Sequence, residues 1–179
     1  MKATGIVRRI DDLGRVVIPK EIRRTMRIRE GDPLEIYTTR EGDVIFKKYS
    51  LLGGLEDFAA QFCDALNRTS GFTAAVTDRD AVIAITGAGK RELLGKSLSG
   101  ALSRVMEERR IYCCQGADQP LPVTDGNDRY TAAVAAPILC EGDVLGLVLF
   151  LSAEGQVPGE GEYKLAQTVS AFLGKHMES

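Results

Sequence analysis

The sequence predicts an α+β protein of two domains, and three observations support this. Residues 1–50 carry 12 lysines and arginines against 8 aspartates and glutamates, whereas residues 51–179 carry 11 against 17. Paired glycines within residues 51–54 interrupt the apolar pattern and predict a linker. Strand-like and helix-like periodicities alternate on both sides of this linker. The sequence therefore predicts domains at 1–50 and 55–179, and a length of 179 residues suits two small domains.

Short strand, turn and helix patterns follow one another at the start of the chain. Residues 5–10 and 15–18 contain β-branched residues that predict two strands. Residues 11–14, DDLG, predict a turn, because their carboxylates can accept backbone N–H bonds and the glycine suits a positive φ. Pro19 suits the first position of a helix, so we expect a helix over residues 20–26. This helix is too short to be stable without packing.

A second hairpin is predicted for the remainder of the amino-terminal domain. Residues 34–38 alternate largely between apolar and polar side chains, which is typical of a half-buried strand. Residues 40–43 form a turn, and residues 44–48 return as the second strand. A domain of about 50 residues buries little surface on its own. We therefore expect an obligate dimer, because a second copy enlarges the core and covers exposed strand edges.

Basic side chains are concentrated in residues 4–28. This segment holds six arginines and one lysine but only three carboxylates. The cations are Arg8, Arg9, Arg15, Lys20, Arg23, Arg24 and Arg27. Arginine stays charged at working pH, and its planar fork suits phosphate oxygens and the guanine edge. The cluster favours a nucleic-acid site over the alternative, which is a solvated face of salt-bridged arginines.

Four short motifs in this domain resemble the AbrB-type transition-state regulator family. They are GIVR at 5–8, D-x-GRVVIP at 12–19, E-x-RR at 21–24 and D-x-LEIY at 32–37. The resemblance implies a swapped-hairpin β-barrel, a dimer whose chains interlace their strands, with double-stranded DNA as partner. It assigns the main DNA contacts to Arg8, Arg15, Arg23 and Arg24. We expect three further cations at the same surface, Lys2, Arg9 and Arg27.

The carboxyl-terminal domain is predicted to be an antiparallel sheet with helices on its faces. Helices are expected at residues 55–69, 97–110 and 159–177, and strands at 72–77, 81–86, 130–139 and 144–152. Residues 111–130 fit no regular pattern. Apolar stripes on the first and last helices predict that both lie on one face of the sheet. These two helices carry more large apolar side chains than packing on one small sheet face requires, which favours a tetramer of two dimers. The side chains are Phe58, Phe62, Val169, Phe172 and Leu173.

The last predicted hairpin resembles the closing hairpin of GAF domains. The resemblance rests on API at 136–138 and GDVLGLVL at 142–149. It implies a flanked antiparallel sheet in which residues 87–130 could bind a small-molecule effector. The sequence contains no cyclic-nucleotide, haem or bilin motif, so it specifies no ligand. A GAF-like domain with a purely structural role is the alternative.

Together the two resemblances imply a sporulation-type, DNA-binding transcriptional regulator that has no catalytic residues, cofactor or metal. The four cysteines lack C-x-x-C spacing, and with His176 alone they give no zinc signature. One alternative is an antitoxin, because the same barrel serves in toxin–antitoxin pairs. Another is an enzyme, because some GAF-like folds reduce free methionine sulfoxide with cysteines, here Cys113 and Cys114. Neither fits as well as a regulator, since the carboxyl-terminal half is periodic and no catalytic constellation accompanies the thiols.

Hydropathy predicts no membrane partner. No run approaches the ~20 apolar residues that a membrane-spanning helix needs. The first four residues, MKAT, carry no apolar signal region. We therefore expect a cytoplasmic protein.

Overall fold

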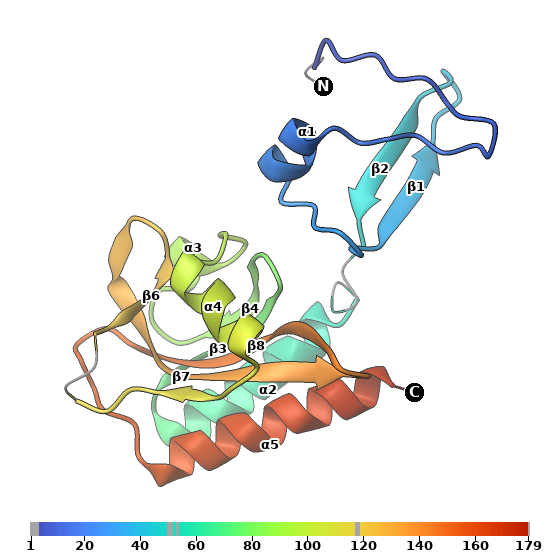
Figure 1. The fold of residues 1–179 in the computed structure, drawn as a ribbon. Helices are drawn as coiled ribbons and strands as arrows, with labels where there is room; N and C mark the ends of the chain where they lie inside the picture. Colours follow the sequence, from blue (N-terminus) through green and yellow to red (C-terminus); the bar gives the residue numbers. More distant parts are fainter. Residues whose placement is uncertain (1–3, 50–51, 53, 117–118, 179) are drawn as a thin grey trace. The chain divides into compact units, whose positions relative to one another are not determined.

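The structure is a computed structural model that describes residues 4–49, 52, 54–116 and 119–178 (Figure 1). The chain divides into two compact units, Met1–Tyr49 and Ser50–Ser179. Residues 51 and 53 of the expected linker lie outside the described residues. Leu52, in contrast, is buried in the core of the carboxyl-terminal unit.

The amino-terminal unit contains one short helix and one hairpin. Helix α1 is Lys20–Thr25, strand β1 is Leu34–Thr38 and strand β2 is Val44–Lys48. Strands β1 and β2 pair antiparallel, with Ile36 opposite Phe46. Their turn is closed by the Gly42 N–H, which donates to the Thr39 carbonyl over 3.2 Å. The predicted helix and second hairpin are thereby confirmed.

The first predicted hairpin is wrong for the single chain. Within residues 4–19, the described backbone contains a turn but no strand. The Asp11 N–H donates to the Arg15 carbonyl and the Gly14 N–H to the Asp11 carbonyl, both over 3.0 Å, and Gly14 has a φ of 77°. The turn prediction is therefore confirmed. The segments beside it are not strands because no other strand of the same chain pairs with their backbone groups.

The amino-terminal unit encloses almost no core. Pro19 is the one buried residue among residues 4–49. Large apolar side chains stay in solvent, with Val7 85%, Val17 71% and Ile36 61% exposed. Such exposure of β-branched residues is unusual for a folded domain and marks a surface that a partner could cover.

The carboxyl-terminal unit is built on one antiparallel sheet. Its strands are β3 (Thr73–Asp78), β4 (Val82–Thr86), β5 (Tyr112–Cys113), β6 (Leu121–Thr124), β7 (Asn127–Cys140) and β8 (Asp143–Ser152). The order is β4-β3-β8-β7-β5, and β6 also pairs with β7. The helices are α2 (Glu56–Ser70), α3 (Lys90–Leu93), α4 (Gly100–Glu108) and α5 (Glu160–Met177). Mixed helices and antiparallel strands confirm the α+β class.

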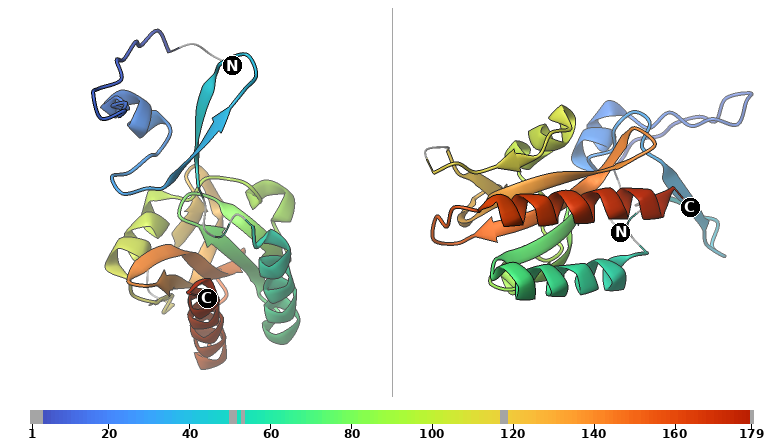
Figure 2. Two further views of the ribbon diagram at one scale, coloured as in Figure 1. Left: turned by 90° about the vertical axis from the view of Figure 1, so that its right-hand side faces the viewer. Right: turned by 90° about the horizontal axis from the view of Figure 1, so that it is seen from below.

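Helices α2 and α5 cover one face of this sheet, as their apolar stripes predicted (Figure 2). Residues of both helices join one core cluster with Phe150 of β8, and Ala59, Leu66 and Leu173 are among them. Helix α5 lies close enough to β7 that a Cβ at Gly174 would overlap the Leu139 carbonyl oxygen. The other face packs against α3 and α4 in a second cluster.

Residues 111–130 are more regular than predicted. They contain β5, β6 and the start of β7, and the short α3 was also missed. Pro122 lies in β6 opposite Thr131, a place where a strand pairs on one side only. Proline is compatible with such an edge strand although it argues against a central one. This is why a stretch rich in proline and glycine still forms a ladder.

Candidate nucleic-acid interface

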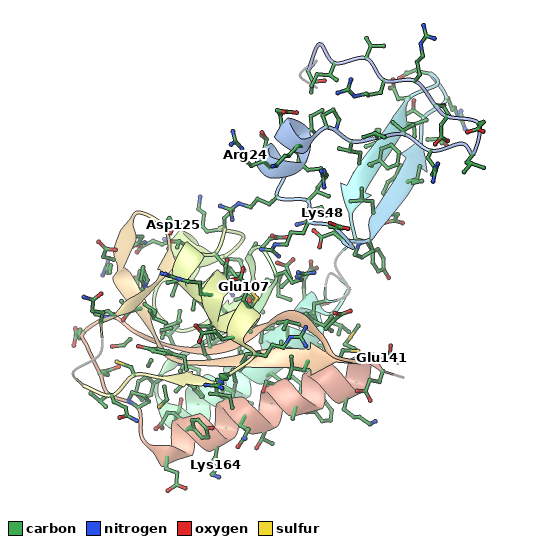
Figure 3. All side chains as sticks on the ribbon, viewed as in Figure 1. Arg24, Lys48, Glu107, Asp125, Glu141 and Lys164 are labelled. Carbon is green, nitrogen blue, oxygen red and sulfur yellow. The ribbon has the colours of Figure 1, made fainter. Side chains whose placement is uncertain are left out.

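The helix that carries two of the predicted contacts begins directly after Pro19. The Pro19 carbonyl accepts from the Arg23 N–H over 2.9 Å, which starts the first turn. Arg23 is half-buried and Arg24 is exposed, and Figure 3 labels Arg24 on α1. Both lie in the last turn, where the helix dipole favours positive charge.

Helix α1 ends in a Schellman motif. In this C-terminal cap, two backbone N–H groups after the helix donate to carbonyls of its last turn, and one residue has a left-handed conformation. The Ile28 N–H donates to the Arg23 carbonyl over 2.7 Å, and the Arg27 N–H donates to the Arg24 carbonyl over 3.2 Å. Arg27 takes the left-handed position with a φ of 52°. Glycine normally fills this position because it has no Cβ to strain. The motif therefore presents an arginine side chain at a position that usually carries a glycine.

The turn before the second predicted strand holds Arg15. Asp11 Oδ1 accepts from the N–H groups of Leu13 (3.0 Å) and Arg15 (2.8 Å). Asp11 Oδ2 also pairs with Arg15 Nε over 2.8 Å. The backbone bond from Arg15, followed by its side-chain bond, holds the pKa of Asp11 below its usual value. The pair is exposed, so it orients the Arg15 side chain but adds little stability.

The structure places the predicted contacts on consecutive segments of the amino-terminal unit. Arg8 and Arg9 precede the Asp11 turn, Arg15 follows it, and the others lie on or just after α1. Within residues 4–49 as described, Arg15 has a carboxylate partner, but none is found for Arg8, Arg9, Arg23, Arg24 or Arg27. Lys2 lies outside the described residues. Most of the cluster is thus available to an external polyanion.

The thiols and the histidine are not brought together. Cys113 and Cys114 line a cavity of ≈ 490 Å³ with Glu160 and Tyr163 of the first turns of α5. His176, near the other end of α5, packs 5.0 Å from the ring of Phe58. Positions 160 and 176 are sixteen residue steps apart along the helix, which is roughly 24 Å. Burial raises the pKa of the Cys63 thiol to about 12, so very little of this thiol is in the reactive thiolate form.

Part of the region expected to bind an effector is filled by packed side chains. Leu93, Leu102 and Val123 are fully buried there in the second core cluster. The Tyr130 ring lies against Gly89, and its hydroxyl donates to Glu92 Oε1 over 3.2 Å. Among the described residues, no group of three or more metal-ligating side chains is found. No helix in the described parts of the chain has the length and apolarity to span a membrane.

The basic hairpin unit and the helix-flanked sheet unit each match a family of known proteins, and the match of the second unit is to a transcription factor. The family "Stage V sporulation protein T C-terminal, transcription factor" matches residues 54–178, and "Antidote-toxin recognition MazE, bacterial antitoxin" matches residues 7–50. The chain belongs to the stage V sporulation protein T family of transcription factors.

Individual relatives agree with this assignment. Stage V sporulation protein T of Bacillus subtilis (strain 168) is 48% identical over 178 residues, which is 99% of both chains. The transition state regulatory protein AbrB of the same organism is 63% identical over 49 residues, 27% of this chain and 50% of that protein. The GAF domain of a phosphoenolpyruvate-protein phosphotransferase from Acinetobacter superposes with a TM-score of 0.51 at 17% identity, covering 73% of this chain and 84% of that one. The AbrB-type and GAF resemblances are thus confirmed, and the interlaced dimer stays a prediction.

Proposed function

We propose that this sporulation-type transcription factor grips double-stranded DNA with the amino-terminal units of two copies. The main contacts are Arg8, Arg15, Arg23 and Arg24, and the further cations are Lys2, Arg9 and Arg27. One observation carries the proposal: cations without carboxylate partners lie in the same small unit as an uncovered apolar surface. The boundaries 1–50, 51–54 and 55–179 belong to the same proposal.

The dimer follows from the face that β1 and β2 leave open. Ile36 and Phe46 are opposite each other in the hairpin register, and both are exposed. Val44 lies two residues from Phe46, on the same face, and is exposed as well. A second copy would cover these side chains and could supply ladder partners to residues 5–10 and 15–18. The interlaced barrel would then contain the strands that the single chain lacks.

DNA affinity in this arrangement comes chiefly from phosphate contacts. Guanidinium groups from both copies would neutralise backbone charges and release counterions. Helix α1 has only 6 residues, fewer than two turns, so it can contact few base edges. Preference among sequences would then depend largely on groove shape and deformability.

The carboxyl-terminal unit would join dimers into a tetramer. Phe62 packs 5.1 Å from Phe58 and 5.5 Å from Phe172, measured between ring centroids. Phe172 nevertheless stays exposed, so the face formed by α2 and α5 can accept a second copy. A GAF fold also permits an effector that shifts DNA affinity. We place the protein in the cytoplasm and assign it no catalytic role.

The antitoxin alternative has one observation in its favour, the MazE-type match over residues 7–50. That match covers the same residues as the proposed DNA-binding unit and does not separate the two functions. Residues 54–178 do separate them, because they match a transcription-factor domain and fold as a helix-flanked sheet. The regulator is therefore the better proposal.

A salt titration of DNA binding tests the function. Full-length protein is mixed with a fluorescein-labelled duplex of mixed sequence, and affinity is read by anisotropy. With four principal arginines from each of two copies, affinity is expected to fall by about 10³-fold or more between about 50 mM and 200 mM salt. Absence of binding at low salt, or binding that is insensitive to salt, would contradict the proposal.

A further inference from the structure

The side chain of Lys48 is directed into its own unit. Its Nζ donates to the Arg27 carbonyl oxygen over 2.8 Å and lies 3.7 Å from Asp32 Oδ2 (Figure 3 labels Lys48 at the end of β2). Asp32 is a well-shielded counter-ion, since its side chain is 6% exposed. The neighbouring Lys47 is different, because its Nζ lies 4.7 Å above the Tyr37 ring on the opposite face of the hairpin.

Asp32 links this lysine to the loop after α1. Its Oδ2 accepts from the Arg29 N–H over 2.8 Å, which closes the loop on itself. Lys48, the last residue of β2, therefore contacts both ends of the loop that follows α1, at Arg27 and at Asp32. We call the Asp32 carboxylate, the Lys48 ammonium and the Arg27 carbonyl the C-terminal clamp of α1.

The residue that the clamp holds is in a costly conformation. Arg27 has a φ of 52°, which a residue with a Cβ adopts only when its surroundings impose it. A glycine would adopt this φ without strain and would close the same Schellman motif. Since Arg27 carries a Cβ, the bond from Lys48 to its carbonyl helps to keep the backbone there.

We propose that Asp32 and Lys48 are positioning residues for DNA recognition. By holding Arg27 in the left-handed conformation, the clamp fixes the end of α1 and with it the guanidinium groups of Arg23, Arg24 and Arg27. In this proposal Lys48 does not contact a phosphate, although it is a cation of the DNA-binding unit. Its ammonium group instead holds the backbone carbonyl of Arg27. This inference rests on the proposed function.

The direction in which Asp32→Asn changes DNA affinity distinguishes the clamp from a purely electrostatic effect. Asp32→Asn keeps an oxygen acceptor for Arg29 but removes a negative charge from the basic unit. Electrostatics alone predicts tighter DNA binding, because the unit becomes more positive. The clamp predicts binding about fivefold weaker, because Lys48 loses the carboxylate that holds its Nζ beside the Arg27 carbonyl and then opposes the strain at Arg27 less well. Lys48→Met should weaken binding by a similar factor, whereas the matched control Lys47→Met should change it less than about twofold.

A double-mutant cycle identifies Arg27 as the target of the clamp. In an Arg27→Gly background the left-handed conformation is free of strain, so Asp32→Asn and Lys48→Met should each weaken binding by less than about twofold. If Lys48 contacts phosphate directly, its effect will be the same in both backgrounds. Should either single variant also lower the thermal midpoint, the cycle still decides, because a general folding defect would not be repaired selectively at position 27.

The outcomes are read on full-length protein with the mixed-sequence duplex. The expected result is weaker binding by Asp32→Asn and by Lys48→Met in the wild-type background, and a much smaller effect of each in the Arg27→Gly background. Asp32→Asn at or above wild-type affinity, or additive effects of Lys48→Met and Arg27→Gly, would overturn the clamp while leaving the DNA-binding function in place. Wild-type protein without salt-dependent binding would overturn both.

Discussion

Replacing Arg23 and Arg24 together by alanine is expected to abolish most DNA affinity. Each side chain loses an interaction worth about 1–3 kcal/mol, and a dimer carries each of them twice. Binding to the labelled duplex at fixed salt should therefore weaken by about 100-fold or more. The slope of log affinity against log salt should also fall by about four, one for each lost phosphate contact. Anisotropy titrations at several salt concentrations measure both quantities.

Arg68→Ala is the matched control for this pair. Arg68 is an exposed arginine on α2, paired with Asp64 over 3.0 Å, and it belongs to the acidic carboxyl-terminal unit. Its removal changes the net charge in the same direction but takes nothing from the proposed interface. Affinity within about twofold of wild type is expected, since exposed ion pairs contribute little. Equal binding by the double variant and this control would remove Arg23 and Arg24 from the interface.

Ile36→Asp is expected to break the amino-terminal dimer. In a monomeric unit Ile36 is 61% exposed, and a surface substitution there would change stability by only about 0.5 kcal/mol. In the proposed dimer the same carboxylate would be buried without a partner, at a cost on the order of 3 kcal/mol or more. Analytical ultracentrifugation of the full chain should therefore show a species of half the wild-type mass, with DNA binding lost in parallel.

Lys47→Asp supplies the control, because it places an aspartate next to Phe46 on the opposite face of the hairpin. That variant should keep the wild-type mass even if its added negative charge weakens DNA binding. A wild-type mass for Ile36→Asp would mean that the apolar face of β1 and β2 is not the dimer contact.

Much of the fold could be predicted because local patterns determine it. The strands at residues 34–38 and 44–48, the stripes on α2 and α5 and the DDLG turn all reappear in the structure. Residues 5–10 and 15–18 were predicted as strands from composition, yet a ladder needs a second strand that this chain alone does not provide. Strand β6 was missed because Pro122 reads as a breaker when its edge position is unknown.

The candidate site also has a part that the sequence predicts and a part that only the structure shows. Arginine clustering identifies the cations, since their chemistry is evident from residue type alone. Arg27 could not be recognised as a left-handed cap, because the usual signal there is glycine. The proposed role of Lys48 depends on a contact across 21 positions in the chain, which composition does not reveal.

The central claim is that the amino-terminal unit alone meets DNA. Amide hydrogen exchange of full-length protein, with and without the duplex, tests it most directly, because local protection reports which backbone becomes ordered or covered. We predict slower exchange within residues 8–29 on addition of DNA and unchanged exchange across residues 54–178. Protection centred on the carboxyl-terminal unit, or no change within residues 8–29, would contradict the claim.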